Sequence, residues 1–231
     1  MARETLSRDQ IVTAALELLD AEGLEGMNMR ALGKRLDSAA TAVYWHVGSR
    51  ESLIALAADR AWAEVELPDP AAVGWRTAAC QMAASEYAML IRHPWLVQAF
   101  GSYQLYGPGK ARHDDHSIAV YEAAGFAGAE ADQATSAVFT FVLGNALGLA
   151  ATASFTRKLG RDGGDVQELL QHKRAEVLAV AAQFPLLRVR LELPSAGYGA
   201  APEGSFAFGL QALLDGLEAR LAARAKSDAS S

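Results

Sequence analysis

The chain has 231 residues, of which 51% are hydrophobic, and it carries a formal net charge of −6. This length allows one large core or a small domain joined to a larger one. A single cysteine, Cys80, excludes an internal disulfide, and the polar N-terminal residues are unlike a signal peptide, so we expect a cytoplasmic protein. The acidic net charge argues against nucleic-acid binding unless basic residues gather locally.

The first expected helix is marked at both ends. Ser7 and Gln10 have the spacing of a capping box, in which two side chains satisfy free backbone N–H groups reciprocally. Apolar residues recur at helical period from Ile11 to Leu19, and Gly23 is placed to end the helix.

Three further helices are expected in the next segment, over about residues 29–36, 39–47 and 50–66. Their predicted N-caps are Asn28, Ser38 and Ser49, whose side chains can accept hydrogen bonds from the first free N–H groups. The second and third helices, joined by a tight turn, have the spacing of a helix-turn-helix whose second member enters the major groove of DNA.

The helix over residues 39–47 has two different faces. Val43 and Val47 are four residues apart and can pack inward against the preceding helix. Ala40, Thr41 and Tyr44 then share the opposite face, where small and hydroxyl-bearing side chains can approach base edges and phosphates. We expect DNA recognition on this face.

Basic residues gather in the same segment. Residues 28–50 contain four basic side chains against one acidic side chain, which gives a local charge of +3. An exposed Tyr44 among these cations favours phosphate contact, whereas Trp45 is expected to pack at the edge of the small helical core. Because each subunit would contact few phosphates, tight binding requires two copies on a dimer.

The two prolines in residues 67–70 stop any helix, and we place the domain boundary there. The predicted domains are residues 1–66 for DNA binding, 67–226 for a larger helical domain, and 227–231 as a disordered tail. Further helices are expected over about 73–92, 95–103, 113–124, 129–155, 166–183 and 204–225, with 185–202 as an irregular loop. The predicted fold class is therefore all-α. The most apolar stretch, 137–155, is interpreted as a buried helix rather than a membrane span.

Enzymatic and metal-binding readings find little support. His113 and His116 flank two acidic residues, but acids are favoured at a helix start by the helix dipole, so we predict no metal site. Neither a zinc-type Cys/His cluster nor a nucleophile elbow is present in the sequence. We therefore predict no catalytic residue, no cofactor and no enzymatic activity.

Several runs together resemble the N-terminal domain of the tetracycline-repressor (TetR) family. They are IVTAALELL at residues 11–19, EGL at 22–24, MRALGKRL at 29–36, TAVYWHV at 41–47 and SRESL at 49–53. A looser likeness, FAFGL at 206–210 with LDGLE at 214–218, is similar to the last helix of the tetracycline repressors themselves.

The resemblance implies particular contacts with DNA. It assigns base contacts to Arg30, Ala40, Thr41 and Ala42, and backbone contacts to Tyr44, His46 and Arg50. Arg50 would share one phosphate with the N-terminus of the fourth helix. Ala40 stands where tetracycline repressors carry a base-reading glutamine, so the operator should differ from theirs.

The resemblance also implies that the second domain encloses a small-molecule pocket and forms a homodimer. Dimerisation would use a four-helix bundle of the long helix and the last helix from each subunit, although their small residues could equally serve the monomer core. The candidate ligand-binding residues are Met82, Glu86, Phe100, Tyr103, Ser117, Thr135 and Phe139. For each of them plain core packing is the alternative. The histidine that holds magnesium-bound tetracycline is replaced near Phe100, so that drug is not the expected effector.

The sequence thus predicts a repressor that binds palindromic double-stranded operator DNA as a homodimer and is released by a small apolar or aromatic effector. No membrane partner is expected. Two alternatives remain: a DNA-binding protein of this fold controlled by a partner protein instead of a ligand, and a helical enzyme that only resembles the family. The sequence does not distinguish a repressor from an activator.

Overall fold

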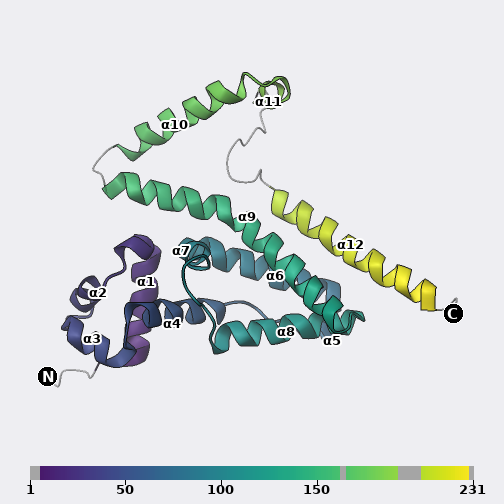
Figure 1. Ribbon diagram of the computed structural model, residues 1–231, viewed down its shortest axis with the longest axis horizontal. Coiled ribbons are helices and arrows are strands. Elements are labelled where there is room, and N and C mark those ends of the chain that lie inside the picture. Colours follow the sequence, from purple (N-terminus) through teal and green to yellow (C-terminus); the bar gives the residue numbers. More distant parts are fainter. Residues whose placement is uncertain (1–5, 162–164, 192–203, 229–231) are drawn as a thin grey trace.

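The computed structural model describes residues 6–161, 165–191 and 204–228, and within these ranges it contains twelve α-helices and no strand (Figure 1). The helices are α1 (Arg8–Gly26), α2 (Met29–Arg35), α3 (Ala40–Val47), α4 (Arg50–Trp62), α5 (Pro70–Val73), α6 (Trp75–Arg92), α7 (Pro94–Ala99), α8 (Pro108–Ala124), α9 (Ala129–Arg161), α10 (Val166–Ala181), α11 (Pro185–Leu191) and α12 (Ser205–Asp228). The predicted all-α class is confirmed.

Helix α1 begins as the sequence predicts but ends differently. The capping box is present, with the Ser7 hydroxyl accepting from the Gln10 backbone and the Gln10 side chain accepting from the Ser7 backbone. Gly23 has a φ of 67°, a conformation that costs glycine little. The helix therefore kinks at Gly23 and continues to Gly26 instead of ending there.

Helices α2 and α3 form the helix-turn-helix. The Asn28 side chain caps α2 by accepting from the Ala31 N–H at 2.8 Å, as predicted. The prediction that Ser38 caps α3 is wrong. Its own N–H is bonded to the Gly33 carbonyl at 2.9 Å within the turn, and α3 starts one residue later, with Ala39 as N-cap and no side-chain cap.

Gly33 is required by the closeness of this turn. A Cβ atom at Gly33 would lie 2.8 Å from the carbonyl oxygen of Ser38 and 3.2 Å from the nitrogen of Ala40, both of which are backbone atoms. We expect Gly33→Ala to displace α3, to lower the free energy of unfolding by about 1–3 kcal/mol, as overpacking does, and to weaken DNA binding. Urea unfolding measures the first effect.

Gly160→Ala is the matched control, because its Cβ would meet only a methyl group of Val166 at 3.8 Å, an ordinary contact in an exposed helix. Its unfolding free energy should stay the same or rise slightly. An unchanged stability of Gly33→Ala would show that the turn has more room than the structure gives it.

Several helix boundaries in the second half differ from the prediction. Helix α4 ends at Trp62 rather than near residue 66, and α9 continues to Arg161. Helix α8 starts at Pro108, not at residue 113, because proline suits the first position of a helix. The predicted loop over 185–202 contains α11 up to Leu191; its remainder lies outside the described residues. Helix α12 includes residues 227 and 228, which were predicted to be disordered.

The buried apolar side chains form one continuous core that runs from the helix-turn-helix into the larger helical part. Figure 1 shows α9 crossing the middle of the molecule, with α12 beside it and with α10 and α11 following from its C-terminal end on the side away from α6 and α8. Helices α6, α7 and α8 pack against α9, and α8 also packs against α4. Helix α4 thus connects the helix-turn-helix to the helices around α9.

Helix α9 is only partly the buried helix that its composition predicts. One stripe of six small or branched residues is buried, whereas Leu147, Leu149 and Phe155 are exposed. By length and composition alone α9 could cross a membrane, but one such helix is weak evidence, because the core helix of a soluble protein passes the same test. An apolar face of this extent on a helix calls for a covering partner.

Candidate DNA-binding surface and effector cavity

The two faces of α3 are arranged as the sequence predicts except at Ala40, which was expected on the open face but packs against the core. Val43 and Val47 are buried in the core, and Thr41 and Tyr44 are exposed on the other side. The remaining predicted contact residues are exposed in the case of Arg30 and half-buried in the case of Ala40, Ala42 and His46. The predicted recognition face is therefore open to a partner.

Trp45 corrects the prediction of an aromatic side chain packed at the edge of the core. It is 83% exposed, and its ring lies edge-on to that of His46 at a centroid distance of 4.8 Å. Its position two residues from both Val43 and Val47 puts it on the far side of a helix with 3.6 residues per turn. That spacing could have revealed the exposure, and it adds Trp45 to the recognition face.

Arg50 has a different set of contacts from the phosphate role that the resemblance implies. Its guanidinium donates to the carbonyl oxygens of Leu24 and Met27 and to the Tyr103 hydroxyl, the last at 2.7 Å. These bonds turn the side chain inward, where it ties the start of α4 to the end of α1 and to the segment after α7. In this conformation Arg50 acts as a connection between the two parts of the molecule.

A cavity of about 300 Å³ lies between α6, α8 and α9. Five of the seven predicted ligand-binding residues line it: Met82, Glu86, Ser117, Thr135 and Phe139. Two do not: the Tyr103 hydroxyl is bonded to Arg50, and Phe100 packs behind the wall, with its ring 5.9 Å from that of Phe139. Ligand contact by the five lining residues stays a prediction.

The sequence reasoning missed several polar residues of the cavity, namely Lys110, His113, Asp114, Tyr121, Asp132 and Ser136. The late predicted start of α8 explains the omission of Lys110, which fell in a loop, whereas the other five lie within helices that were predicted. Once the helix begins at Pro108, residues 110, 114, 117 and 121 recur at helical spacing on one face. That pattern was the available signal.

Glu86 is the most unusual residue of the cavity. It is 3% exposed, its Oε1 atom has no hydrogen-bond partner, and its Oε2 atom lies 3.8 Å from Nε2 of His113. Burial raises the pKa of Glu86 to about 8, so the carboxyl is largely protonated at pH 7. Burial also lowers the pKa of His113. The hydroxyl of Thr135 is a second buried oxygen without a partner. Unpaired buried polar groups are costly, and their presence beside a cavity is typical of a ligand site.

The wall of the cavity touches α4 through two residues. The Lys110 ammonium pairs with Asp114 and lies 4.8 Å from the centroid of the Trp62 ring on α4. The Asp59 carboxylate, also on α4, accepts the backbone N–H groups of Gly109 at 2.7 Å and Lys110 at 3.2 Å. Since the Gly107 N-cap residue of α8 provides no side-chain cap, Asp59 caps that helix from outside.

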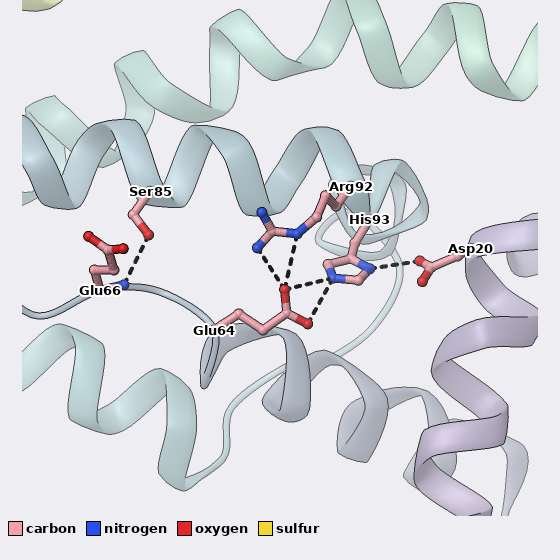
Figure 2. A network of polar contacts seen from close by, with 6 residues as sticks. All are labelled: Asp20, Glu64, Glu66, Ser85, Arg92 and His93. Atoms are coloured by element: carbon pink, nitrogen blue, oxygen red, sulfur yellow. Dashed lines mark hydrogen bonds and ion pairs between the residues drawn. The ribbon is translucent and has the colours of Figure 1, made fainter.

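A polar network joins the helix-turn-helix part to the other end of α4 (Figure 2). The buried His93 ring bonds Asp20 of α1 through Nδ1 at 2.7 Å and Glu64, just after α4, through Nε2 at 3.2 Å. Arg92 also binds Glu64, and Trp95 donates to Asp20. Burial alone disfavours the imidazolium, but the hydrogen bonds and charges of Asp20 and Glu64 outweigh it and raise the pKa of His93.

This network predicts a pH dependence of stability. A raised pKa in the folded state means that protonated His93 stabilises the fold below pH 6.5, and that this contribution disappears as the pH rises through the raised pKa. The pKa of Glu64 is lowered, because burial, which would raise it, is outweighed by the bonds to Arg92 and His93. The stability that ionised Glu64 contributes is therefore lost only on acidification below pH 4.5. Urea unfolding across pH 5.5 to about 8.5 should therefore show a falling free energy in wild type, to which the raised pKa of buried Glu86 contributes as well.

His93→Gln should make that fall less steep, leaving the part that belongs to Glu86, whereas His172→Gln, which removes an imidazole exposed on α10, should leave it unchanged. A His93→Gln protein with the wild-type pH profile would refute the stabilising role of the imidazolium.

Among the described residues no group of three or more His, Cys, Asp or Glu side chains is placed to hold a metal ion.

Two family comparisons together match most of the chain. Residues 11–57 match the bacterial regulatory proteins of the tetR family, and residues 67–221 match the tetracyclin repressor-like C-terminal domain. An HTH-type transcriptional regulator of Saccharopolyspora erythraea is 33% identical over 183 residues, which are 78% of this chain and 75% of that protein. The HTH-type transcriptional repressor DrrR1 of Streptomyces coeruleorubidus is 30% identical over 224 residues, covering 96% of this chain and 81% of DrrR1. These relatives are regulators and not enzymes.

Solved structures of a TetR family protein, ActR of Streptomyces coelicolor, share the fold. Apo ActR superimposes with a TM-score of 0.72 and 27% identity, over 96% of this chain and 100% of ActR. The complex of ActR with actinorhodin gives a TM-score of 0.70 and 26% identity, over 93% of this chain and 96% of ActR.

Proposed function

The chain belongs to the tetracycline-repressor (TetR) family of bacterial regulatory proteins, and from this premise we propose that it is a ligand-released transcriptional repressor. The observation that carries the proposal is the position of α4. At its start α4 belongs to the helix-turn-helix, and further along, through Asp59 and Trp62, it contacts the wall of a cavity that contains unpaired buried polar atoms.

We place the DNA contact on the exposed face of α3 and the start of α2. Thr41 and Ala42, with Ala40 and Arg30, read base edges, and Tyr44, Trp45 and His46 contact the DNA backbone. Arg50 is excluded from this set as long as its guanidinium keeps the three inward bonds of the present conformation. Residues 1–66 form the DNA-binding domain, and 67–226 the effector and dimerisation domain, of a cytoplasmic protein.

The palindromic operator is bound by a homodimer, which we build from α9 and α12. Leu147, Leu149 and Phe155 of α9 are exposed in the single chain, and Phe208 of the neighbouring α12 is 79% exposed. A second copy covering both helices would make a four-helix bundle and remove this apolar surface from water. The dimer would hold its two α3 helices about 34–36 Å apart, the spacing of successive major grooves.

The effector is a small, largely apolar and aromatic molecule that fills the cavity between α6, α8 and α9. Support comes from the apolar and aromatic walls and from ActR, whose structure has been solved with actinorhodin. A ligand that displaces the start of α8 also moves Asp59 and thus α4. The two α3 helices then lose the spacing that the operator requires.

A thermal-shift screen of small aromatic compounds, followed by operator release, tests the ligand-controlled part. A compound that binds only the native state stabilises it by RT ln(1 + L/Kd), where L is its free concentration, and so raises the melting temperature with the logarithm of that concentration, and the same compound should release labelled operator DNA. If stabilising compounds never release the operator, control by a partner protein becomes the better account.

A further inference from the structure

The charges around the cavity are unbalanced. Each of the three helices that line it contributes one carboxyl group: Glu86 from α6, Asp114 from α8 and Asp132 from α9. Among the described lining residues the cations are limited to Lys110, which pairs with Asp114, and His113, whose pKa is lowered by burial. Lys110 also acts on Glu86 through its charge, but its ion pair is with Asp114, and the exposed Asp132 has no cation partner among the described ion pairs.

The burial of Glu86 distinguishes this cavity from an acidic surface whose carboxylates are all in contact with solvent. Its side chain is buried, it lines the cavity, and its Oε1 atom is enclosed without any donor or acceptor. A carboxyl group in this position costs free energy unless a partner arrives. His113 does not provide that partner, because its Nε2 atom lies 3.8 Å from Oε2, beyond hydrogen-bond distance.

We propose that the cavity is built for an effector that carries an ammonium group on an aromatic body, with Glu86 as the carboxylate that receives the ammonium. The proposal rests on the proposed function, because it assigns a ligand chemistry to the same cavity. The ring of Phe139 and the apolar side chains of Met82 and Val138 provide the wall for the aromatic body, and Thr135 offers a hydroxyl to a further polar group.

The alternative to an ammonium-bearing effector is a neutral ligand whose carbonyl accepts a hydrogen bond from protonated Glu86. It would satisfy Oε1 equally well, but it would leave the Asp132 carboxylate of α9 without a counter-charge in the cavity. An ammonium group satisfies both features at once. Charge-assisted hydrogen bonds are also stronger than neutral ones, which matters in a site shielded from water.

Two probes of nearly equal size separate these chemistries: 9-(aminomethyl)anthracene, which is cationic, and 9-(hydroxymethyl)anthracene, which is neutral. Binding is followed by the fluorescence of the probe in the absence of DNA. We expect the amine to bind the wild-type protein at least about tenfold more tightly than the alcohol, as one strong charged hydrogen bond provides. Glu86→Gln should remove this preference and change the affinity for the alcohol less than threefold.

Asp115→Asn is the matched control, because it removes one carboxylate from the exposed side of α8 without touching the cavity. It should keep the preference for the amine. Glu86→Gln should also fold normally, since the carboxyl it replaces is largely protonated at pH 7 and the amide has the same shape. A melting temperature close to that of wild type confirms this.

The number of protons released on binding distinguishes an ion pair at Glu86 from a purely structural role of this residue in shaping the cavity. Protonated Glu86 must ionise to receive an ammonium, so the amine should release close to one proton per site at pH 7 and the alcohol none. The affinity for the amine should rise about tenfold per pH unit up to about pH 7 and level off above pH 8. The other titratable or charged groups facing Glu86 are Lys110, His113, Asp114 and Tyr121 on α8 and Asp132 on α9. Calorimetry in two buffers of different ionisation enthalpy measures the released proton.

Equal affinities of wild type for the two probes, an amine preference that survives Glu86→Gln, or no binding of either probe would each overturn the ammonium assignment. The proposed function fails differently, through the loss of specific operator binding or of its release by any aromatic compound. An alcohol that binds as tightly as the amine and releases the operator would therefore refute the ammonium and leave the repressor standing.

Discussion

Tyr44→Ala is expected to weaken operator binding by the dimer about 100-fold or more without changing the melting temperature. Tyr44 is 46% exposed on α3 and is not part of the buried core that Val43 and Val47 join, so its ring contributes little to stability. A hydrogen bond to a charged phosphate is worth about 1.5–3 kcal/mol, and a dimer loses two of them. Fluorescence anisotropy with labelled operator measures the change.

Tyr106→Ala is the control for this substitution, because Tyr106 is also an exposed tyrosine, at 66%, but it lies between α7 and α8, away from α3. It should bind the operator like wild type. Wild-type affinity of Tyr44→Ala would mean that the exposed face of α3 is not the surface that contacts DNA, whatever the fold.

The second large effect is expected at Asp59, and it concerns control rather than DNA affinity. The approach of α4 to α8 is very close: a Cβ atom at Gly109 would lie 2.5 Å from the backbone oxygen of Asp59. The carboxylate adds the cap on the N–H groups of Gly109 and Lys110, the second of which belongs to a cavity residue. Movement of the start of α8 is therefore passed directly to α4.

Asp59→Ala should bind the operator within a few-fold of wild type and lose most of its response to an effector. Coupling energies between sites are typically about 1–3 kcal/mol, so an effector that weakens operator binding 5- to 150-fold in wild type should do so only a few-fold in this variant. The measurement is the operator affinity with and without saturating effector. Asp115→Ala, on the exposed side of α8, should respond like wild type; a full response of Asp59→Ala would remove Asp59 from the coupling route.

Local signals made the N-terminal half predictable. The caps at Ser7, Asn28 and Ser49 are formed by side chains that reach only three residues along the chain, and each is present in the structure. The sides of α3 follow from the spacing of Val43 and Val47. The prediction that Trp45 packs at the edge of the core failed because it rested on the size of the side chain, which favours burial, and not on its position on the helix.

Long-range contacts explain most of the other differences. No local pattern indicates that Asp59 caps α8 from fifty residues away, and without that cap the predicted start of α8 is too late and leaves Lys110 outside the helix. The inward bonds of Arg50 likewise depend on Leu24, Met27 and Tyr103, which only the folded chain brings together. Five cavity residues could nevertheless be named, because the resemblance supplies what spacing cannot.

The central claim is that the helix-turn-helix recognises a specific operator and that the cavity controls this recognition. The most direct measurement is a mobility shift of the purified protein on the DNA upstream of its own gene, at two salt concentrations, with scrambled DNA of equal length as control. The account predicts a complex of one dimer or a pair of dimers that forms on the upstream DNA alone, weakens steeply with salt, and dissociates when a cavity-binding aromatic compound is added. Equal affinity for the two DNAs at both salt concentrations, in protein refolded from denaturant to remove any bound ligand, would contradict it.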